Sequence, residues 1–382
     1  MALMLACGPG PERRIQPVVI GGSISLTGSN ARTGQEMKHG YDLWVEDVNA
    51  RGGLLGHPVE LRIYDDQSNP ATGRRLYERL IQEDRVDLVT SPYGSPVAAT
   101  ACAVALKHGY PMIAAGAAAT ELWDQCPRFL FGVFSPDERY MDGAIEVARA
   151  QGARTVAIIH ENTNFATGVA AGAASYAREK GLEVVLHEAY ARDAKDFTAL
   201  IEKVKAAKPA VVIGGTYLPD AVNFTRQAKE LRLDAAMIAL SVGPALPDFY
   251  KDLGSDADFI YGASQWEPSL RLPGVEEFVR KYVAAYGYEP GYHAATGYGA
   301  GQILEAAVGL AGSLDVARLR DALQALETTT VFGPYRVDDK GRQLAKPSYL
   351  TQWQSGRREI VWPPDTSTAE PVWPAPAWRA RR

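Results

Sequence analysis

The stretch from residue 18 to residue 73 constrains the fold of this chain more than any other. It begins with an apolar run, continues through a loop of Gly, Ser and Thr into a long helical pattern, and reaches a second predicted strand at 59–64. Four large apolar residues of that pattern recur at helical spacing: Met37, Tyr41, Trp44 and Val48. We therefore predict a strand–helix–strand unit whose first loop presents hydroxyls and backbone N–H groups to an anion.

The same alternation continues along the chain. The patterns predict strands at 18–26, 59–65, 86–91, 111–115, 129–134, 155–160, 182–190, 210–214, 235–240 and 258–263. They predict helices at 34–51, 70–84, 95–108, 136–151, 165–180, 196–207, 219–231, 273–286, 293–312 and 315–326. A β-rich end follows at 329–337, 347–353 and 357–362. Strands alternating with helices of this length indicate an α/β fold with parallel sheets covered on both faces.

Length and charge narrow the class of protein. A chain of 382 residues is too long for one ordinary core, so we expect two lobes. The net charge of −5 and the scattered Arg pairs give no basic surface for nucleic acid. No apolar run has the length of about 20 residues that a membrane helix needs.

Several motifs together are similar to one known family. They are the loop around Leu26-Thr27-Gly28, the turn 49–56, the acidic pair Asp65-Asp66, and the segments 91–95, 111–117, 156–165, 196–201, 214–217, 226–228 and 332–335. In this order the chain resembles the Leu/Ile/Val-binding (branched-chain amino acid) branch of the type I periplasmic binding proteins, the substrate-binding components of ABC transporters. The resemblance covers residues 17–355.

The resemblance implies two Rossmann-like lobes with central parallel sheets, a ligand cleft between them and a hinge of three crossovers near 133–136, 262–268 and 335–348. Lobe 1 would comprise 17–134 plus 267–340, and lobe 2 would comprise 135–262 plus 345–362. The Pro-rich end, 363–382, is expected to be an unstructured tail.

Residues 1–16 are similar to the end of a bacterial lipoprotein signal followed by a tether, with Cys7 as the lipidation candidate. An oxidising compartment would then permit Cys102 and Cys126 to form a disulfide. Two separate buried thiols are an equal alternative for that pair.

Ligands of open parallel sheets bind beyond the carboxyl ends of the strands. With the resemblance, this rule predicts the following ligand-binding residues: Arg32, Thr33, Tyr93, Ser95, Gly116, Ala117, Ala118, Phe165, Tyr217 and Ser241. Ser95, as N-cap of helix 95–108, would meet a ligand carboxylate, and backbone N–H groups near Ala117 and Ala118 would complete the carboxylate nest.

Two departures from the family pattern leave two classes of ligand possible, an amino acid or another organic acid. Ala118 stands where amino-acid binders commonly have Thr, and segment 239–243 lacks the acid that meets a ligand ammonium. Glu161, Asp220 or Glu267 would have to replace that acid, because a buried ammonium needs a partner. Alternatively the ligand is an aromatic or other organic acid, whose carboxylate Arg32 could bind bidentately.

The remaining motifs favour binding over catalysis. The chain lacks the common hydrolase, P-loop, zinc-protease and Cys-x-x-Cys motifs, and its six His residues are isolated in sequence. We assign His293 and its neighbours to packing.

We predict an extracytoplasmic or periplasmic, non-enzymatic solute-binding protein with no cofactor and no metal. Its partners would be a carboxylate-bearing small molecule and an ABC permease with its ATPase, and it would meet the membrane only through a lipid anchor. A ligand sensor without transport is the alternative, and a hydrolase is a third possibility.

Overall fold

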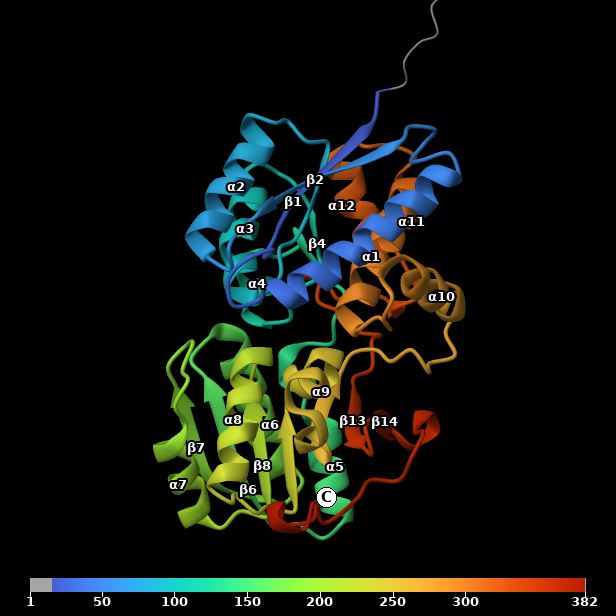
Figure 1. Cartoon of the computed structure of the whole chain (residues 1–382). Coiled ribbons are helices and arrows are strands. Elements are labelled where there is room, and N and C mark those ends of the chain that lie inside the picture. Colours follow the sequence, from blue (N-terminus) through green and yellow to red (C-terminus); the bar gives the residue numbers. More distant parts are fainter. Residues whose placement is uncertain (1–15, 382) are drawn as a thin grey trace, which may run out of the picture.

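The computed structural model describes residues 16–381 and contains two lobes, each built on a central sheet (Figure 1). The sheet of the first lobe has five strands in the order β2-β1-β3-β4-β5, and all its pairs are parallel. Their bounds are β1 Val18–Ile24, β2 Val59–Asp65, β3 Leu88–Thr90, β4 Met112–Ala114 and β5 Leu130–Gly132. Strands β3 to β5 are fully buried, which explains why their sequences are mostly apolar and carry no charged residue.

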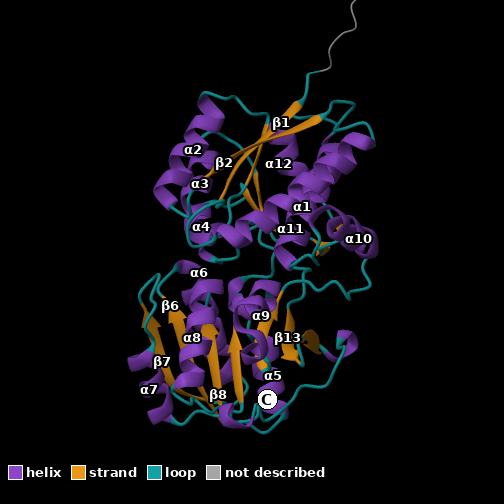
Figure 2. Cartoon of the chain, viewed as in Figure 1, coloured by secondary structure: helices purple, strands orange, loops and turns teal. Residues whose placement is uncertain are grey.

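Helices cover both faces of this sheet, as the colours of Figure 2 show. The helices of the first lobe are α1 Ala31–Ala50, α2 Pro70–Gln82, α3 Ser95–Lys107, α4 Glu121–Gln125, α10 Val275–Tyr286, α11 Tyr292–Ala311 and α12 Val316–Ala325. The apolar stripe of Met37, Tyr41, Trp44 and Val48 on α1 is buried, as its spacing predicts. Segment 329–337, predicted as one strand, is instead a two-stranded hairpin of β11 Thr328–Thr330 and β12 Gly333–Tyr335.

The second lobe has a seven-stranded sheet in the order β14-β13-β10-β9-β8-β6-β7. Its strands are β6 Thr155–Glu161, β7 Glu183–Tyr190, β8 Val211–Gly215, β9 Met237–Leu240, β10 Ile260–Ser264, β13 Tyr349–Gln354 and β14 Arg357–Trp362. The flanking helices are α5 Asp142–Ala150, α6 Asn164–Glu179, α7 Thr198–Ala207, α8 Leu218–Glu230 and α9 Pro247–Leu253. Strands β6 to β10 are parallel. Strand β13 pairs antiparallel with β10, and β14 pairs antiparallel with β13. The predicted α/β class with parallel sheets in two lobes is confirmed.

The two parallel sheets repeat one topology. In each, the first strand lies between the second and the third, and the fourth and fifth continue outward. The order therefore reverses direction beside β1 and β3 in the first lobe, and beside β6 and β8 in the second. Such a switch point opens a crevice at the carboxyl ends of the strands. The fold thus predicts where a ligand enters each lobe.

Three chain segments connect the lobes and are hydrogen-bonded to one another. Ser135 donates its N–H to Gln265 Oε1 at 2.9 Å and its hydroxyl to the Lys346 carbonyl at 2.7 Å. Gln343 donates its side-chain amide to the Val133 carbonyl at 3.4 Å. The boundaries assigned to the lobes from the sequence stay a prediction.

Two sequence predictions differ from the structure in this region. The helix predicted at 136–151 is a short turn at Asp137–Arg139 followed by α5. The carboxylate of Asp137 accepts N–H groups from Thr120 at 3.1 Å and Glu138 at 2.9 Å, which stops the first turn from continuing as a helix.

The Pro-rich end is also not an unstructured tail. Up to residue 381 it runs along the second lobe, the red segment at the foot of Figure 1. Trp378 is buried there and donates its indole N–H to the Leu233 carbonyl at 2.9 Å. Val372 accepts hydrogen bonds from Tyr261 at 2.9 Å and Gln352 at 3.1 Å. Aromatic burial holds a segment whose composition alone suggested disorder.

Cys102, on α3, and Cys126, which follows α4, form a disulfide with Cα atoms 6.3 Å apart. Cys7 and the predicted signal remnant lie outside the described residues, apart from Gln16. Within residues 16–381 no helix combines the length and the apolar character needed to cross a bilayer.

Candidate functional site

Loops at the carboxyl ends of strands of the two lobes face one another across the cleft and enclose a small cavity, which we call the inner chamber. The first lobe contributes Tyr93, Gly94 and Ser95 from the end of β3, with Gly116 and Ala118 from the end of β4. In this conformation the chamber has a volume of about 20 Å³, close to the space that one water molecule needs. Its position agrees with the rule that ligands of parallel sheets bind beyond the carboxyl ends of the strands.

Ser95 is the polar centre of the inner chamber. It was predicted to cap α3, but the cap residue is Gly94 and Ser95 is the first residue of the helix. Its hydroxyl oxygen instead accepts the N–H groups of Ala118 at 3.2 Å and Ala119 at 3.1 Å. The N–H groups that were expected to bind a ligand carboxylate therefore donate to the Ser95 hydroxyl oxygen instead. In residues 16–381 no acceptor lies opposite the Ser95 hydroxyl hydrogen, which leaves a polarised O–H to donate to an anion.

Two glycines let the backbone come close to this chamber. Gly94 has a φ of +84°, a conformation that residues with a side chain rarely adopt. At Gly116 an added Cβ would lie 2.8 Å from the Cα of Tyr93 and 2.9 Å from the Pro92 carbonyl. The start of α3 therefore points its positive end at the chamber with no side chain in between.

The other walls of the inner chamber are aromatic. The first lobe and its connection supply Phe134, Tyr292 and His293, and the second lobe supplies Tyr140, Phe165 and Tyr217. Ring centroids are 5.1 Å apart for Tyr140 and Phe165 and 5.5 Å apart for Phe165 and Tyr217. Residues from both lobes are needed to close the chamber.

Two buried polar atoms in these walls lack a partner in the described part of the chain: the Tyr217 hydroxyl and His293 Nδ1. Burial lowers the pKa of His293 well below its ordinary value, so its ring is neutral at physiological pH. A buried polar atom without a hydrogen bond costs about 1–3 kcal/mol. A polar group of a ligand entering this chamber would relieve that cost.

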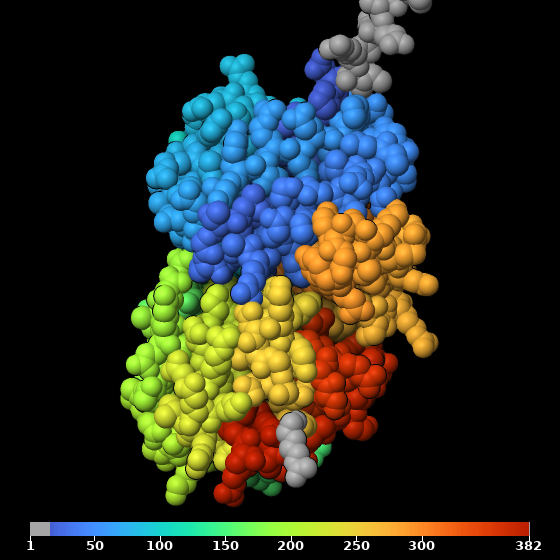
Figure 3. Space-filling view, viewed as in Figure 1, coloured from blue at the N-terminus to red at the C-terminus, as the bar shows by residue number. Residues whose placement is uncertain are grey.

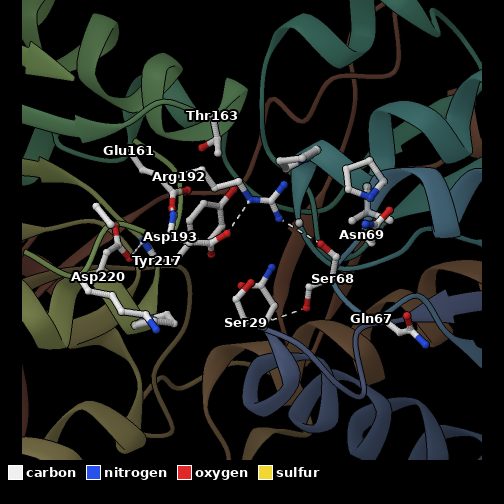
Figure 4. A pocket seen from close by; sticks show the side chains of 18 of the residues that line it. Ser29, Gln67, Ser68, Asn69, Glu161, Thr163, Arg192, Asp193, Tyr217 and Asp220 are labelled. Carbon is white, nitrogen blue, oxygen red and sulfur yellow. Dashed lines mark hydrogen bonds and ion pairs between the residues drawn. The ribbon is translucent and has the colours of Figure 1, made fainter. Parts of the chain in front are cut away.

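A larger cavity, the outer chamber, continues from the inner one past Gly94 and Tyr217, which line both. Its volume is about 620 Å³, within the range of small-molecule sites. Figure 4 shows Ser29, Gln67, Ser68 and Asn69 on the first lobe facing Glu161, Thr163, Tyr217 and Asp220 on the second. Unlike the inner chamber, it is lined mainly by polar and charged side chains.

Arg192 spans the outer chamber. Its Nη2 donates to the Ser68 carbonyl of the opposite lobe at 3.1 Å, and its Nε lies 3.8 Å from the Asp193 carboxylate. The lobes are thus in contact across the cleft, and Figure 3 shows blue atoms of the first lobe meeting green and yellow atoms of the second.

Arg32, predicted to bind a ligand carboxylate, is paired with another group. Its Nη1 lies 2.6 Å from the Asp252 carboxylate and 3.8 Å from that of Asp248, both on α9 of the other lobe. It lines a third cavity of about 330 Å³ that shares Ser29 with the outer chamber. The guanidinium therefore links the lobes, because the two aspartates already satisfy its charge.

Glu161 and Asp220 form an acidic wall of the outer chamber. Burial, followed by the charge of Glu161, raises the pKa of Asp220 to about 7. Burial also raises the pKa of Glu161. Asp220 accepts the Tyr190 hydroxyl at 2.5 Å and the Tyr217 N–H at 2.8 Å. In residues 16–381 neither carboxylate has a cation within ion-pair distance.

The third candidate acid, Glu267, does not reach the site. It is buried against Arg358, whose guanidinium contacts it at 2.8 Å through Nε and through Nη2. Since that guanidinium already balances its charge, Glu267 is an unsuitable partner for a ligand ammonium.

The structure brings most of the predicted ligand-binding residues together. Tyr93, Ser95, Gly116, Ala118, Phe165 and Tyr217 line the inner chamber, and Arg32 and Thr33 line the third cavity. Ala117 is buried next to the chamber without lining it. Ser241 lines none of these cavities, because its hydroxyl bridges the N–H and the carbonyl of Thr216 between two strands.

Sequence reasoning missed several lining residues. His293 and Tyr292, assigned to packing, line the inner chamber, and Ser68 and Arg192 line the outer one. Ser68 and Arg192 follow β2 and β7, so the rule applied to the other strands would have found them. Tyr292 and His293 begin α11, which follows the helix α10 and not a strand, so the rule gives no signal for them. Within the described residues no cluster of His, Cys, Asp and Glu is arranged to hold a metal ion.

Comparisons with known proteins bear on the family and on the fold. The model of a family described as periplasmic binding protein matches residues 17–358. A Leu/Ile/Val-binding protein homolog 7 of Brucella abortus is 29% identical, over 92% of this chain and 93% of that protein.

Two solved structures share the fold. One is the branched-chain amino acid transporter substrate binding protein LivJ from Streptococcus pneumoniae in complex with isoleucine, with a TM-score of 0.81, 24% identity and coverage of 91% of this chain and 100% of that one. The other is a solute binding protein of an ABC transporter from R. palustris in complex with benzoate, with a TM-score of 0.81, 21% identity and coverage of 94% and 98%.

Proposed function

Because the chain belongs to the periplasmic binding protein family, we propose that it captures a small carboxylate-bearing solute between its lobes for an ABC importer. The family match confirms the resemblance predicted from the sequence. The partners in this proposal are a membrane permease and its ATPase, and the protein works outside the cytoplasm, tethered by a lipid on Cys7. No covalent step is involved.

The single observation that carries the proposal is the inner chamber. Its polar end combines the free hydroxyl hydrogen of Ser95 with the N-terminus of α3, and both favour a negative group. Its aromatic walls come from both lobes. A ligand therefore makes its full set of contacts only when the lobes are closed, and it stabilises that state by its differential affinity.

In this proposal the permease recognises the closed form of the protein. In the closed protein Arg192 and Arg32 join the lobes through Ser68 and Asp252. These exposed polar contacts contribute less than about 1 kcal/mol each. They align the lobes without holding them closed when no ligand is bound.

The experiment compares carboxylates with their amides by calorimetry, using hexanoate against hexanamide and leucine against leucinamide. We expect at least one carboxylate to bind with micromolar or tighter affinity, about −8 kcal/mol, and its amide to bind at least tenfold more weakly. In Ser95→Ala the preference for the carboxylate should fall by 10- to 100-fold, since a hydrogen bond to a charged group contributes about 1.5–3 kcal/mol.

Ser255→Ala, at an exposed serine of the second lobe, is the matched control and should leave binding unchanged. The melting temperature of each variant without ligand separates a loss of binding from a loss of folding. Equal binding of carboxylate and amide, or a preference untouched by Ser95→Ala, would refute the proposed role of the inner chamber.

A further inference from the structure

The outer chamber carries an inference that rests on the proposed function and goes beyond it. An α-amino acid has its ammonium one carbon away from its carboxylate. Here the carboxylate site at Ser95 lies in the inner chamber of the first lobe, whereas the acidic wall of Glu161 and Asp220 lies in the outer chamber of the second. Tyr217 lines both chambers and stands between the two sites.

The volumes of the two chambers also favour a solute that extends through both of them. The inner chamber, at about 20 Å³, leaves room beside Ser95 for about one water-sized group, such as one carboxylate oxygen, and the outer chamber, at about 620 Å³, accommodates the body of a solute. The lining of the outer chamber is mostly polar, with Ser29, Asn30, Gln67 and Asn69 on one side. The amide and hydroxyl groups on these walls can hydrogen-bond to polar atoms of a solute, which a branched aliphatic side chain does not offer.

In the described part of the chain, two acidic side chains of the outer chamber have no cation paired with them. Its charged residues are Glu161, Asp193 and Asp220 against Arg192 and Lys195. Arg192 is directed to Asp193 and to the Ser68 carbonyl, and Lys195 is exposed. Glu161 and Asp220 therefore repel each other without a paired cation in the described part of the chain.

A second observation marks this wall as a place for a ligand. The Tyr217 hydroxyl, in a side chain that is 9% exposed, has no hydrogen-bond partner in residues 16–381. The Thr163 hydroxyl, which lines the same chamber, also has none. An ammonium has three donor hydrogens, and these two oxygens and the carboxylates offer it acceptors.

We propose that the solute is an ω-amino carboxylate, held by its carboxylate at Ser95 in the inner chamber and by its distant ammonium at Glu161, Asp220 and Tyr217 in the outer chamber. Several carbons separate the two charged ends and pass beside the Tyr217 ring. A branched-chain amino acid leaves the acidic wall uncompensated and binds more weakly.

Protonation is coupled to this mode of binding. In the free protein the pKa of Asp220 is about 7, raised by burial and by Glu161. A bound ammonium favours the charged carboxylate and lowers that pKa, so binding near pH 7 releases protons. The other titratable groups facing Asp220 are Tyr190 and Tyr217, which burial keeps neutral.

The test measures binding of 6-aminohexanoate, hexanoate and leucine by calorimetry. We expect 6-aminohexanoate to bind at least tenfold more tightly than either of the others. Asp220→Asn and Glu161→Gln should each reduce the ratio between 6-aminohexanoate and hexanoate at least fivefold. Glu183→Gln, at an exposed acid on β7, should leave the ratio unchanged.

A readout on the unmodified protein does not depend on whether the variants fold. Binding of 6-aminohexanoate at pH 7, measured in buffers with different ionisation enthalpies, should release protons, whereas hexanoate should release none. Leucine or hexanoate binding as tightly as 6-aminohexanoate would overturn the inferred solute class and leave carboxylate capture intact. Failure of all carboxylates to bind would overturn the proposed function itself.

Discussion

Lys346 offers the sharpest test of how burial controls the energetics of this fold. It lies in the third connection between the lobes, is 3% exposed, and its Nζ has no hydrogen-bond partner among the described residues. The Nζ lies 4.5 Å from the centroid of the Phe332 ring and 5.2 Å from that of Tyr349. Burial lowers its pKa from 10.5 to about 7. We predict that Lys346→Met, which keeps an apolar stem and removes the charge, stabilises the protein.

The magnitude follows from the pKa. Each pKa unit corresponds to about 1.4 kcal/mol, so the change from 10.5 to about 7 costs the folded state about 5 kcal/mol at low pH. A lysine with a lowered pKa destabilises the fold fully below the folded-state value, and the penalty disappears as pH rises towards 10.5. The penalty is about 4 kcal/mol at pH 7 and about 2 kcal/mol at pH 9. Attraction to the two rings subtracts about 0.5–2 kcal/mol from the gain.

The assay is urea unfolding of both proteins at pH 7 and pH 9. We expect the stability advantage of Lys346→Met to be about 2 kcal/mol smaller at pH 9 than at pH 7. Lys107→Met, at an exposed lysine in the last turn of α3, should differ little from the unmodified protein at either pH. A difference between Lys346→Met and the unmodified protein that is independent of pH would refute the reasoning, because only a titrating buried ammonium produces the slope.

Two further predictions concern the elements that hold each lobe together. Trp378→Ala should lower the free energy of unfolding by about 3–5 kcal/mol, because the ring is buried against the second lobe; urea unfolding measures this, and a loss below about 1 kcal/mol would contradict the ordered tail. Replacing Cys102 and Cys126 together by Ala should cost about 3 kcal/mol, because the bridge closes a loop between residues separated by 24 positions; an unchanged unfolding midpoint under oxidising conditions would contradict it.

The fold was largely predictable because its signals are local. The spacing of Met37, Tyr41 and Trp44 identifies one face of α1, and the apolar runs identify the buried strands. The site positions at the ends of β3, β4 and β8 followed from the same local patterns and from the switch-point rule. The tail shows where local signals fail, because its Pro content predicts disorder, whereas the burial of Trp378 against the second lobe orders it.

The sequence by itself determined which elements form and which strand ends can present a ligand site, since helical and strand periodicities need only neighbouring residues. Only the tertiary structure decided what those side chains do. It turned Arg32 towards Asp252, directed Ala118 N–H to Ser95, and placed Glu161 beside Asp220 in one chamber. The physical reason is that charge pairing and burial depend on distance in space, and partners far apart along the chain meet only when the lobes pack.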